Sequence, residues 1–121
     1  MLDENNYIKV INGFSKTHWK PLLDLIPEIE KETSFCEIII RFIQIIDELP
    51  IVIVFNWMEW KEGWEMIKNK NFDFDTIDIP TKCKIITGIV RSDRFNGGAL
   101  ELAFESGLIY NILKSIEKQL N

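Results

Sequence analysis

Two arginines three positions apart are the residues best suited to chemistry in this chain. Arg91 and Arg94 stand in the segment 91–98, RSDRFNGG, and Arg41 is the one other arginine. A guanidinium grips a carboxylate or phosphate through a planar fork of N–H groups, which lysine does not reproduce. A helix beginning at Gly98 would add free backbone amides to an anion site. The candidate ligand-binding residues of this interpretation are Arg91, Asp93, Arg94, Gly98 and Glu105.

The same arginines have a structural interpretation. A turn at 96–98 would fold the following helix back antiparallel, so that Arg91 or Arg94 pairs with Glu105 or Asp93. Such an ion pair would clamp the two helices as a hairpin. We favour the clamp over the anion site, because structural ion-pair networks imitate functional ones.

No group of residues specifies a catalytic centre. His18 is the only histidine, which excludes mechanisms that need two imidazoles, and we expect it to be exposed near a helix start. Cys36 and Cys83 lack other Cys or His residues at metal-ligand spacing, and both fall on apolar helical faces, where thiols act as core side chains. We therefore expect no catalytic residue, no metal and no cofactor, and we disfavour an enzyme.

Charge and hydropathy exclude further classes of protein. The 121 residues include 14 Lys+Arg and 19 Asp+Glu, for a net charge of -5, which disfavours non-specific binding to nucleic acid. The longest apolar run, 51–55, is far shorter than the ~20 residues of a membrane-spanning helix. The polar opening at 1–6 lacks the features of a secretory signal. We expect a small acidic cytoplasmic protein with reduced thiols that binds no membrane.

Helices must position these residues, and the clearest one is predicted over 34–49. Its apolar residues follow a helical stripe, Ser34 and Glu37 have the form of a capping box, and Pro50 supplies the stop. We expect this helix to be the central, most buried one. The residues expected to widen its buried face are Cys36, Ile40 and Ile43.

Weaker patterns flank this helix. Two short helices near the N-terminus are expected to be broken by Gly13 and Pro27. The run 51–55 indicates a buried strand or an extended connector, and periodicity does not distinguish these from a continuing helix. A helix is expected to start at Asn56, followed by a loop at 70–78 whose phenylalanines dock on the core. The residues expected on the buried face of that helix are Trp57, Trp60, Trp64 and Ile67.

Two more helices complete the predicted fold. One is capped by Asp78 and runs to about Asp93, with a solvated face formed by Lys82, Lys84 and Arg91. After the turn, a long final helix reaches Leu120. Its small residues Ala99, Ala103 and Gly107 would let another backbone approach. The sequence thus predicts one all-α domain over 1–121, a compact bundle of about five to six helices, with 51–55 as the one candidate extended segment.

Several stretches resemble an uncharacterised bacterial and phage domain family of unknown function. They are 87–95 (TGIVRSDRF), 98–100 (GAL), 104–108 (FESGL), 112–113 (IL) and, upstream, 57–60 (WMEW). The resemblance covers roughly residues 50 to 118 and brings no established activity. It implies that the framework or site of the family includes Arg91, Asp93, Arg94, Phe95 and Gly98. It also implies that an acidic residue is usual where Asn56 and Gly97 stand here.

Two functions fit these features. The first is a non-catalytic interaction or regulatory module, such as an inhibitor, whose acidic clusters meet a basic surface of another protein. The second is a binding protein or enzyme for a small phosphate, nucleotide or carboxylate, centred on Arg91 and Arg94. We favour the first, as a monomer or homodimer, because a binding surface needs no nucleophile, acid–base pair or metal. The candidate partner-surface residues are Glu28, Glu30, Glu32, Asp73 and Asp75.

Overall fold

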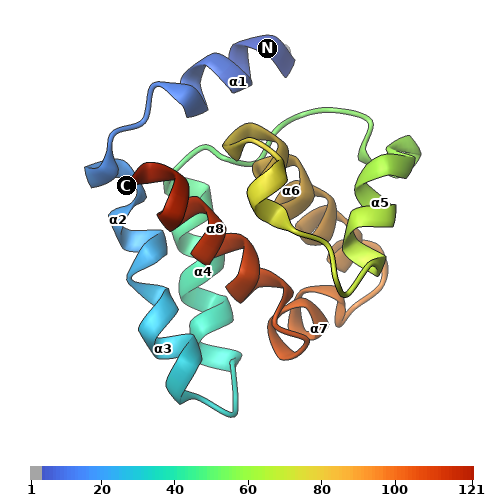
Figure 1. Cartoon of the computed structure of the whole chain (residues 1–121). Helices are drawn as coiled ribbons and strands as arrows, with labels where there is room; N and C mark the ends of the chain where they lie inside the picture. The colour runs from blue at the N-terminus through green and yellow to red at the C-terminus, as the bar shows by residue number, and fades with distance from the viewer. Residues whose placement is uncertain (1–3) are drawn as a thin grey trace.

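The structure is a computed structural model that describes residues 4–121; residues 1–3 of the polar opening lie outside the described part. Its elements, in chain order, are α1 (Glu4–Asn12), α2 (Lys16–Leu23), α3 (Leu25–Lys31), α4 (Cys36–Glu48), the 3-10 turn η1 (Trp57–Glu59), α5 (Lys61–Lys68), the 3-10 turn η2 (Phe74–Thr76), α6 (Ile79–Phe95), α7 (Ala99–Glu105) and α8 (Leu108–Leu120). The described residues form no β-strand, which confirms the all-α class (Figure 1). None of their helices is long and apolar enough to cross a membrane.

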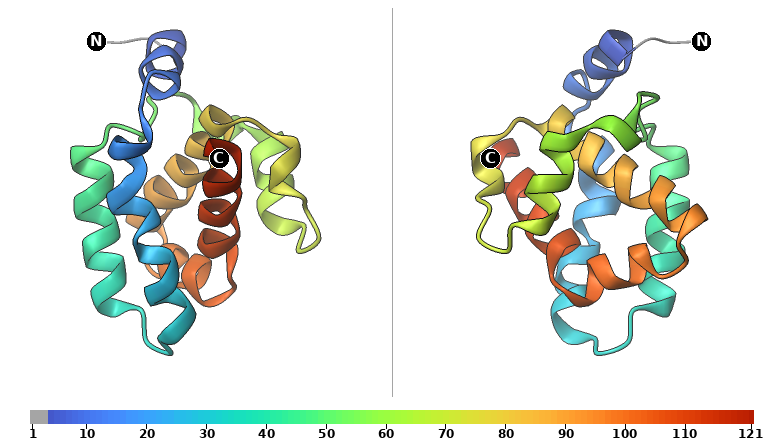
Figure 2. Two further views of the ribbon diagram at one scale, coloured as in Figure 1. Left: turned by 60° about the vertical axis from the view of Figure 1, so that its left-hand side comes forward. Right: turned by 90° about the vertical axis from the view of Figure 1, so that its right-hand side faces the viewer.

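The centre of the fold is made by α6 and α8. Four side chains of α8 are fully buried, namely Ile109, Ile112, Leu113 and Ile116. In contrast, α4 lies at the outside of the bundle (Figure 2) and buries only Ile38, Phe42 and Ile46. The expectation that α4 is the most buried helix is therefore wrong. The three residues expected to widen its buried face, Cys36, Ile40 and Ile43, are exposed, because α2, α3 and α7 cover α4 from one side only.

The capping box predicted at the start of α4 is not formed, and one is found instead at the start of α2. The cap position of α4 is Phe35, which makes no side-chain cap hydrogen bond, so the predicted capping box of Ser34 and Glu37 is wrong. A capping box occurs instead at α2, where the Ser15 amide donates to Nδ1 of His18 at 3.1 Å. His18 is exposed at this helix start, as predicted, and has a structural role there. Pro27 lies within the first turn of α3 and does not end it.

The segment 50–55 is an extended connector and not a strand. Ile51 and Ile53 are buried, and the Ile53 amide donates to Oγ1 of Thr87 on α6 at 2.9 Å. The Thr87 hydroxyl in turn donates to the Cys83 carbonyl one helical turn earlier, at 2.7 Å. The buried amide that a neighbouring strand would otherwise satisfy is thus satisfied by a helix side chain.

The helix expected from Asn56 begins later, at Lys61, after the separate turn η1. Trp60 stands between the two elements, and its ring lies over the first turn of α5. A Cβ at Gly63 would come within 2.1 Å of that ring, so this close approach requires glycine. The loop that follows docks as predicted, with Phe74 buried and in edge-to-face contact with Phe72 at 5.0 Å.

The start of α6 agrees with the sequence prediction in its cap but differs from it in the placement of Lys82. Asp78 does cap α6, since its Oδ1 accepts from the Thr81 amide at 2.9 Å. However, Lys82, which was expected on the solvated face, is 0% exposed. Within residues 4–121 its Nζ has no hydrogen-bond partner, and burial lowers its pKa.

The predicted long final helix is two helices, because the chain turns at Gly107. This glycine adopts φ +84°, in the left-handed region that side chains disfavour. A Cβ added there would meet nothing within 4 Å. Gly107 therefore breaks the helix and does not make room for a neighbouring backbone, as the small-residue row was expected to do.

Candidate functional site

Arg91 and Arg94 lie on the last turns of α6 without ionic partners. Among the described residues, neither arginine makes an ion pair or a side-chain hydrogen bond. The predicted clamp to Glu105 or Asp93 is therefore absent from this part of the chain. Arg91 is partly buried and Arg94 is exposed, so both guanidinium groups remain available to a group from outside the chain.

The turn after α6 is closed by Asp93. Its Oδ1 accepts hydrogen bonds from the amides of Gly98, at 3.2 Å, and Leu100, at 3.0 Å. These are amides that the anion-site interpretation left free, and a carboxylate of the chain itself already uses them. Glu105 lies at the opposite end of α7. Glu105 is exposed but lies away from the turn, so Arg91 and Arg94 are the members of the predicted ligand-binding set that stand at this turn without ionic partners in the described chain.

The arginines line a groove of about 460 Å³ between α4, the extended connector and α6. Its walls include the apolar side chains of Ile43, Val52 and Val54, of which Val54 is 45% exposed. The groove therefore places two cationic groups, without ion pairs in the described chain, beside accessible apolar surface, and the carboxylates of Asp47 and Asp93 also line it.

Exposed apolar side chains continue this surface beyond the groove. Phe95, directly after Arg94, is 74% exposed, and its ring centroid lies 6.0 Å from that of Trp57. Met58, the neighbour of Trp57 in the chain, is 65% exposed. The backbone of Trp57 is fixed by a hydrogen bond, in which Nε1 of Trp64 donates to the Trp57 carbonyl at 3.0 Å. We call the set Val54, Met58, Arg91, Arg94 and Phe95 the arginine–aromatic surface.

Hydrophobic periodicity did not find the apolar half of this surface; of its apolar members, the family resemblance alone singled out Phe95. Phe95 and Met58 do not belong to the buried stripe of a helix, so hydrophobic periodicity gave them no role. The available signal was the position of Phe95, a large aromatic residue between Arg94 and the polar turn 96–98. An aromatic side chain at such a helix end has no later turn of its own helix to pack against.

Most of the predicted acidic partner surface is used inside the molecule. Glu28 accepts from Arg41 at 2.9 Å, and this hydrogen bond lowers the pKa of Glu28. Glu30 accepts from the Tyr110 hydroxyl at 2.9 Å, and Asp73 caps η2. Glu32 is exposed at the end of α3. These contacts attach α3 to α4 and α8, so they have a structural role.

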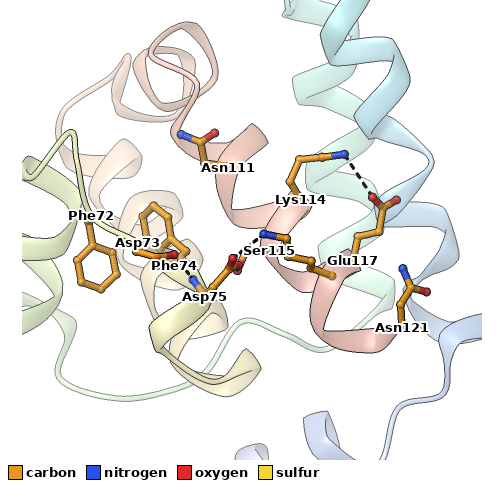
Figure 3. A pocket seen from close by; sticks show the side chains of 10 residues that line it. Phe72, Asp73, Phe74, Asp75, Asn111, Lys114, Ser115, Glu117 and Asn121 are labelled. Atoms are coloured by element: carbon orange, nitrogen blue, oxygen red, sulfur yellow. Dashed lines mark hydrogen bonds and ion pairs between the residues drawn. The ribbon is translucent and has the colours of Figure 1, made fainter.

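Asp75 is the most heavily bonded of these acids. It lines a cavity of about 330 Å³ together with residues of α8 (Figure 3), and its carboxylate accepts from Ser115 at 2.5 Å and from Lys118 at 2.7 Å. The hydrogen bond from Lys118, followed by that from Ser115, lowers the pKa of Asp75. The loop at 70–78 is thereby fastened to the C-terminal half of α8.

Residues suited to metal or thiol chemistry are not gathered in the described part of the chain. No group of three or more His, Cys, Asp or Glu side chains in residues 4–121 is arranged to hold a metal ion. Cys83 is buried, as expected, and burial raises the pKa of its thiol. Among the described residues, the arginine–aromatic surface is the strongest candidate site.

The comparisons with known proteins place the chain in a family. No curated protein and no solved structure matches it. Residues 31–121 match DUF6508, which is described as a family of unknown function. The matched region contains α4 to α8 and the whole arginine–aromatic surface, whereas α1 and α2 precede it. The chain therefore belongs to the family of unknown function DUF6508.

Proposed function

We propose that this protein is a non-catalytic interaction module that docks a partner protein on the arginine–aromatic surface. One observation carries the proposal. Two arginines without ionic partners in the described chain share the end of α6 with Phe95, which is 74% exposed and packs against Trp57, and Met58, the next residue after Trp57, is 65% exposed. Aromatic residues, methionine and arginine are the types enriched at the centres of protein interfaces.

The surface specifies the chemistry of the partner. Burying an aromatic side chain such as Phe95 is worth about 1.5–3 kcal/mol. A forked bond from Arg94 to a carboxylate adds directional strength at its edge. The matching partner surface has an acidic side chain next to apolar ones, with one side chain that enters the groove beside Arg91.

A basic partner is less well supported. Four of the five acids expected to meet such a partner are bonded within the chain, namely Glu28, Glu30, Asp73 and Asp75. A small phosphate or nucleotide ligand is also less well supported, because Asp93 already uses the amides at the start of α7. The proposal takes the module to act in the cytoplasm, in a bacterial or phage context, as a monomer or homodimer.

The test compares two surface variants with two matched controls. Arg94→Glu and Phe95→Ala alter the surface, whereas Lys31→Glu and Ile40→Ala make the same kinds of change at exposed positions on α3 and α4. Proteins retained by each immobilised variant from extracts of the source cell are quantified by isotope-labelled mass spectrometry. The affinity of the purified partner is then measured by calorimetry.

We expect one acidic partner to be retained by the wild type and by both controls. Its affinity should fall by about 30-fold or more with Arg94→Glu and with Phe95→Ala, as for interface residues that dominate binding. Equal retention by all four variants would refute the proposal, as would equal loss with the controls. Circular dichroism and melting temperature confirm that each variant is folded.

A further inference from the structure

A second cavity, of about 600 Å³, lies among α5, α6, α7 and α8. It shares no lining residue with the arginine–aromatic surface. Its volume falls in the range of about 300–1,000 Å³ that is typical of small-molecule sites. The lining is largely apolar and comes from all four helices and η2, through Trp64, Ile67, Phe74, Ile89, Leu102 and Leu108. Such a lining suits the hydrocarbon part of a ligand.

The wall formed by Trp64 is fixed before any ligand arrives. Its indole Nε1 donates to the Trp57 carbonyl at 3.0 Å, and its ring packs edge-to-face against the Trp57 ring with centroids 6.1 Å apart. A side chain fixed by two such contacts loses little freedom when a ligand binds. The cavity is therefore pre-organised on its α5 side.

All the charge that lines the cavity is positive. Lys68, at the end of α5, and Lys70, just after it, are the charged residues among the lining side chains. Neither lysine forms an ion pair with another residue in the described range 4–121. In a chain of net charge -5, two unpaired cations beside an apolar cavity favour an anionic ligand group there.

Size decides between a small molecule and a peptide. Two turns of an α-helix, about 10 Å wide and 11 Å long, occupy about 850 Å³, which exceeds the 600 Å³ of the cavity. Nearly a third of such a helix would remain outside it, whereas a single hydrocarbon chain can be enclosed completely.

We propose that this cavity binds a small amphipathic carboxylate of the medium-chain fatty-acid type. The hydrocarbon tail packs against Trp64 and Ile89, and the carboxylate lies between Lys68 and Lys70 at the rim. Leu102, which is 64% exposed, covers part of the tail at the opening.

Decanoate, octanoate and 1-decanol are the probes that test this site, at concentrations below aggregation. Binding to the full chain is followed by tryptophan fluorescence and by calorimetry, with Trp64→Phe to assign the fluorescence change. We expect decanoate to bind saturably and about 16-fold more tightly than octanoate, at about fourfold per methylene. We expect 1-decanol, which lacks the charge, to bind at least about tenfold more weakly than decanoate.

Variants locate the ligand. Leu102→Glu and the double change Lys68→Glu with Lys70→Glu should each weaken decanoate by at least about tenfold. The matched controls are Ile40→Glu, at a position 58% exposed on α4, and Lys61→Glu, at the start of α5, and both should bind as the wild type does. No saturable binding, equal affinity for 1-decanol, or equal losses in the controls would each overturn the proposal.

The result is independent of the function proposed for the arginine–aromatic surface. Phe95→Ala lies outside the cavity lining, so it should leave decanoate binding unchanged while it weakens the protein partner. Loss of decanoate binding in Phe95→Ala would refute two separate sites and would join the cavity to that surface.

Discussion

Replacing the buried Lys82 with methionine should stabilise the protein. The lysine lies in the second turn of α6 and is 0% exposed, and its Nζ has no hydrogen-bond partner in residues 4–121. Burial lowers its pKa, although the nearby charges of Asp75 and Asp78 oppose this shift. Methionine has a similar length and needs no hydrogen bond, so Lys82→Met removes the penalty and keeps most of the packing.

The expected gain in stability depends on the cost of burying the Lys82 ammonium group without a hydrogen bond. A buried polar group without a partner costs about 1–3 kcal/mol, and more when it is charged. For 121 residues, an unfolding entropy of about 2.1 cal/mol/K per residue gives about 0.25 kcal/mol/K. A gain of about 1–3 kcal/mol therefore raises the melting temperature by about 4–12 °C.

The pH dependence supplies a second signature. The pKa of Lys82 is lower in the folded chain than its ordinary value of about 10.4 in the unfolded chain. Between the two values the unfolded state binds more protons, so the stability of the wild type rises with pH across this window. Below the folded pKa the penalty is fully present. The advantage of Lys82→Met should therefore shrink as the pH approaches 10.

Urea unfolding and calorimetry at pH 7 and at pH 9.5 measure both effects, with the exposed Lys61→Met as the matched control. The reasoning would be refuted if Lys82→Met were no more stable than Lys61→Met at pH 7. It would also be refuted if the two variants lost or gained stability in parallel between the two pH values.

Four further substitutions test two glycines, the cap of α7 and the carboxylate of Asp75. Gly63→Ala should lower the free energy of unfolding by about 1–3 kcal/mol, because the new methyl overlaps the Trp60 ring. Gly88→Ala should raise it by up to about 1 kcal/mol through helix propensity, since its methyl makes only ordinary contacts, and thermal melts should show the opposite signs. Asp93→Ala removes the acceptor that caps α7 and should cost about 0.5–2 kcal/mol in urea unfolding. The lowered pKa of Asp75 stabilises the fold above its ordinary pKa of about 3.9, and this contribution is lost as the pH falls; Asp75→Asn should flatten the acid limb of a melting curve recorded from pH 2 to 6.

Sequence patterns correctly predicted those parts of the fold in which the spacing of a residue and its type indicate the same environment, buried or exposed. The Asp78 cap and the apolar stripe of α6 are such a case. Lys82 is a case in which the two signals conflict, because it is spaced four and seven residues before the buried Ile86 and Ile89, yet its type favours solvent. The spacing of Lys82 indicated its burial correctly, whereas its residue type did not. The exposed side of α4 could not be foreseen, since an apolar arc does not reveal which neighbours cover it.

The candidate site was foreseen only in part. The unusual pairing of Arg91 and Arg94 was visible in the sequence, but their lack of ionic partners depends on where α7 points. That direction is set by Asp93, whose bonds to the amides five and seven residues later follow no local spacing rule. Phe95 meets Trp57, the chain neighbour of Met58, only because η1 folds against the end of α6.

Both ends of α7 favour glycine because of the backbone conformation there, and not because a larger side chain would collide with its neighbours. Gly98 and Gly107 have φ +101° and +84°, and a Cβ at either would meet nothing within 4 Å. An L-alanine there should cost about 1–2 kcal/mol, as any left-handed residue does. A D-alanine, its enantiomer, fits the same backbone and should instead stabilise by about 0.4–1 kcal/mol, since it restricts the unfolded chain. Two mirror-image residues of identical volume would thus shift the stability in opposite directions, and semisynthesis of the segment that contains α7 and α8 would make the comparison direct.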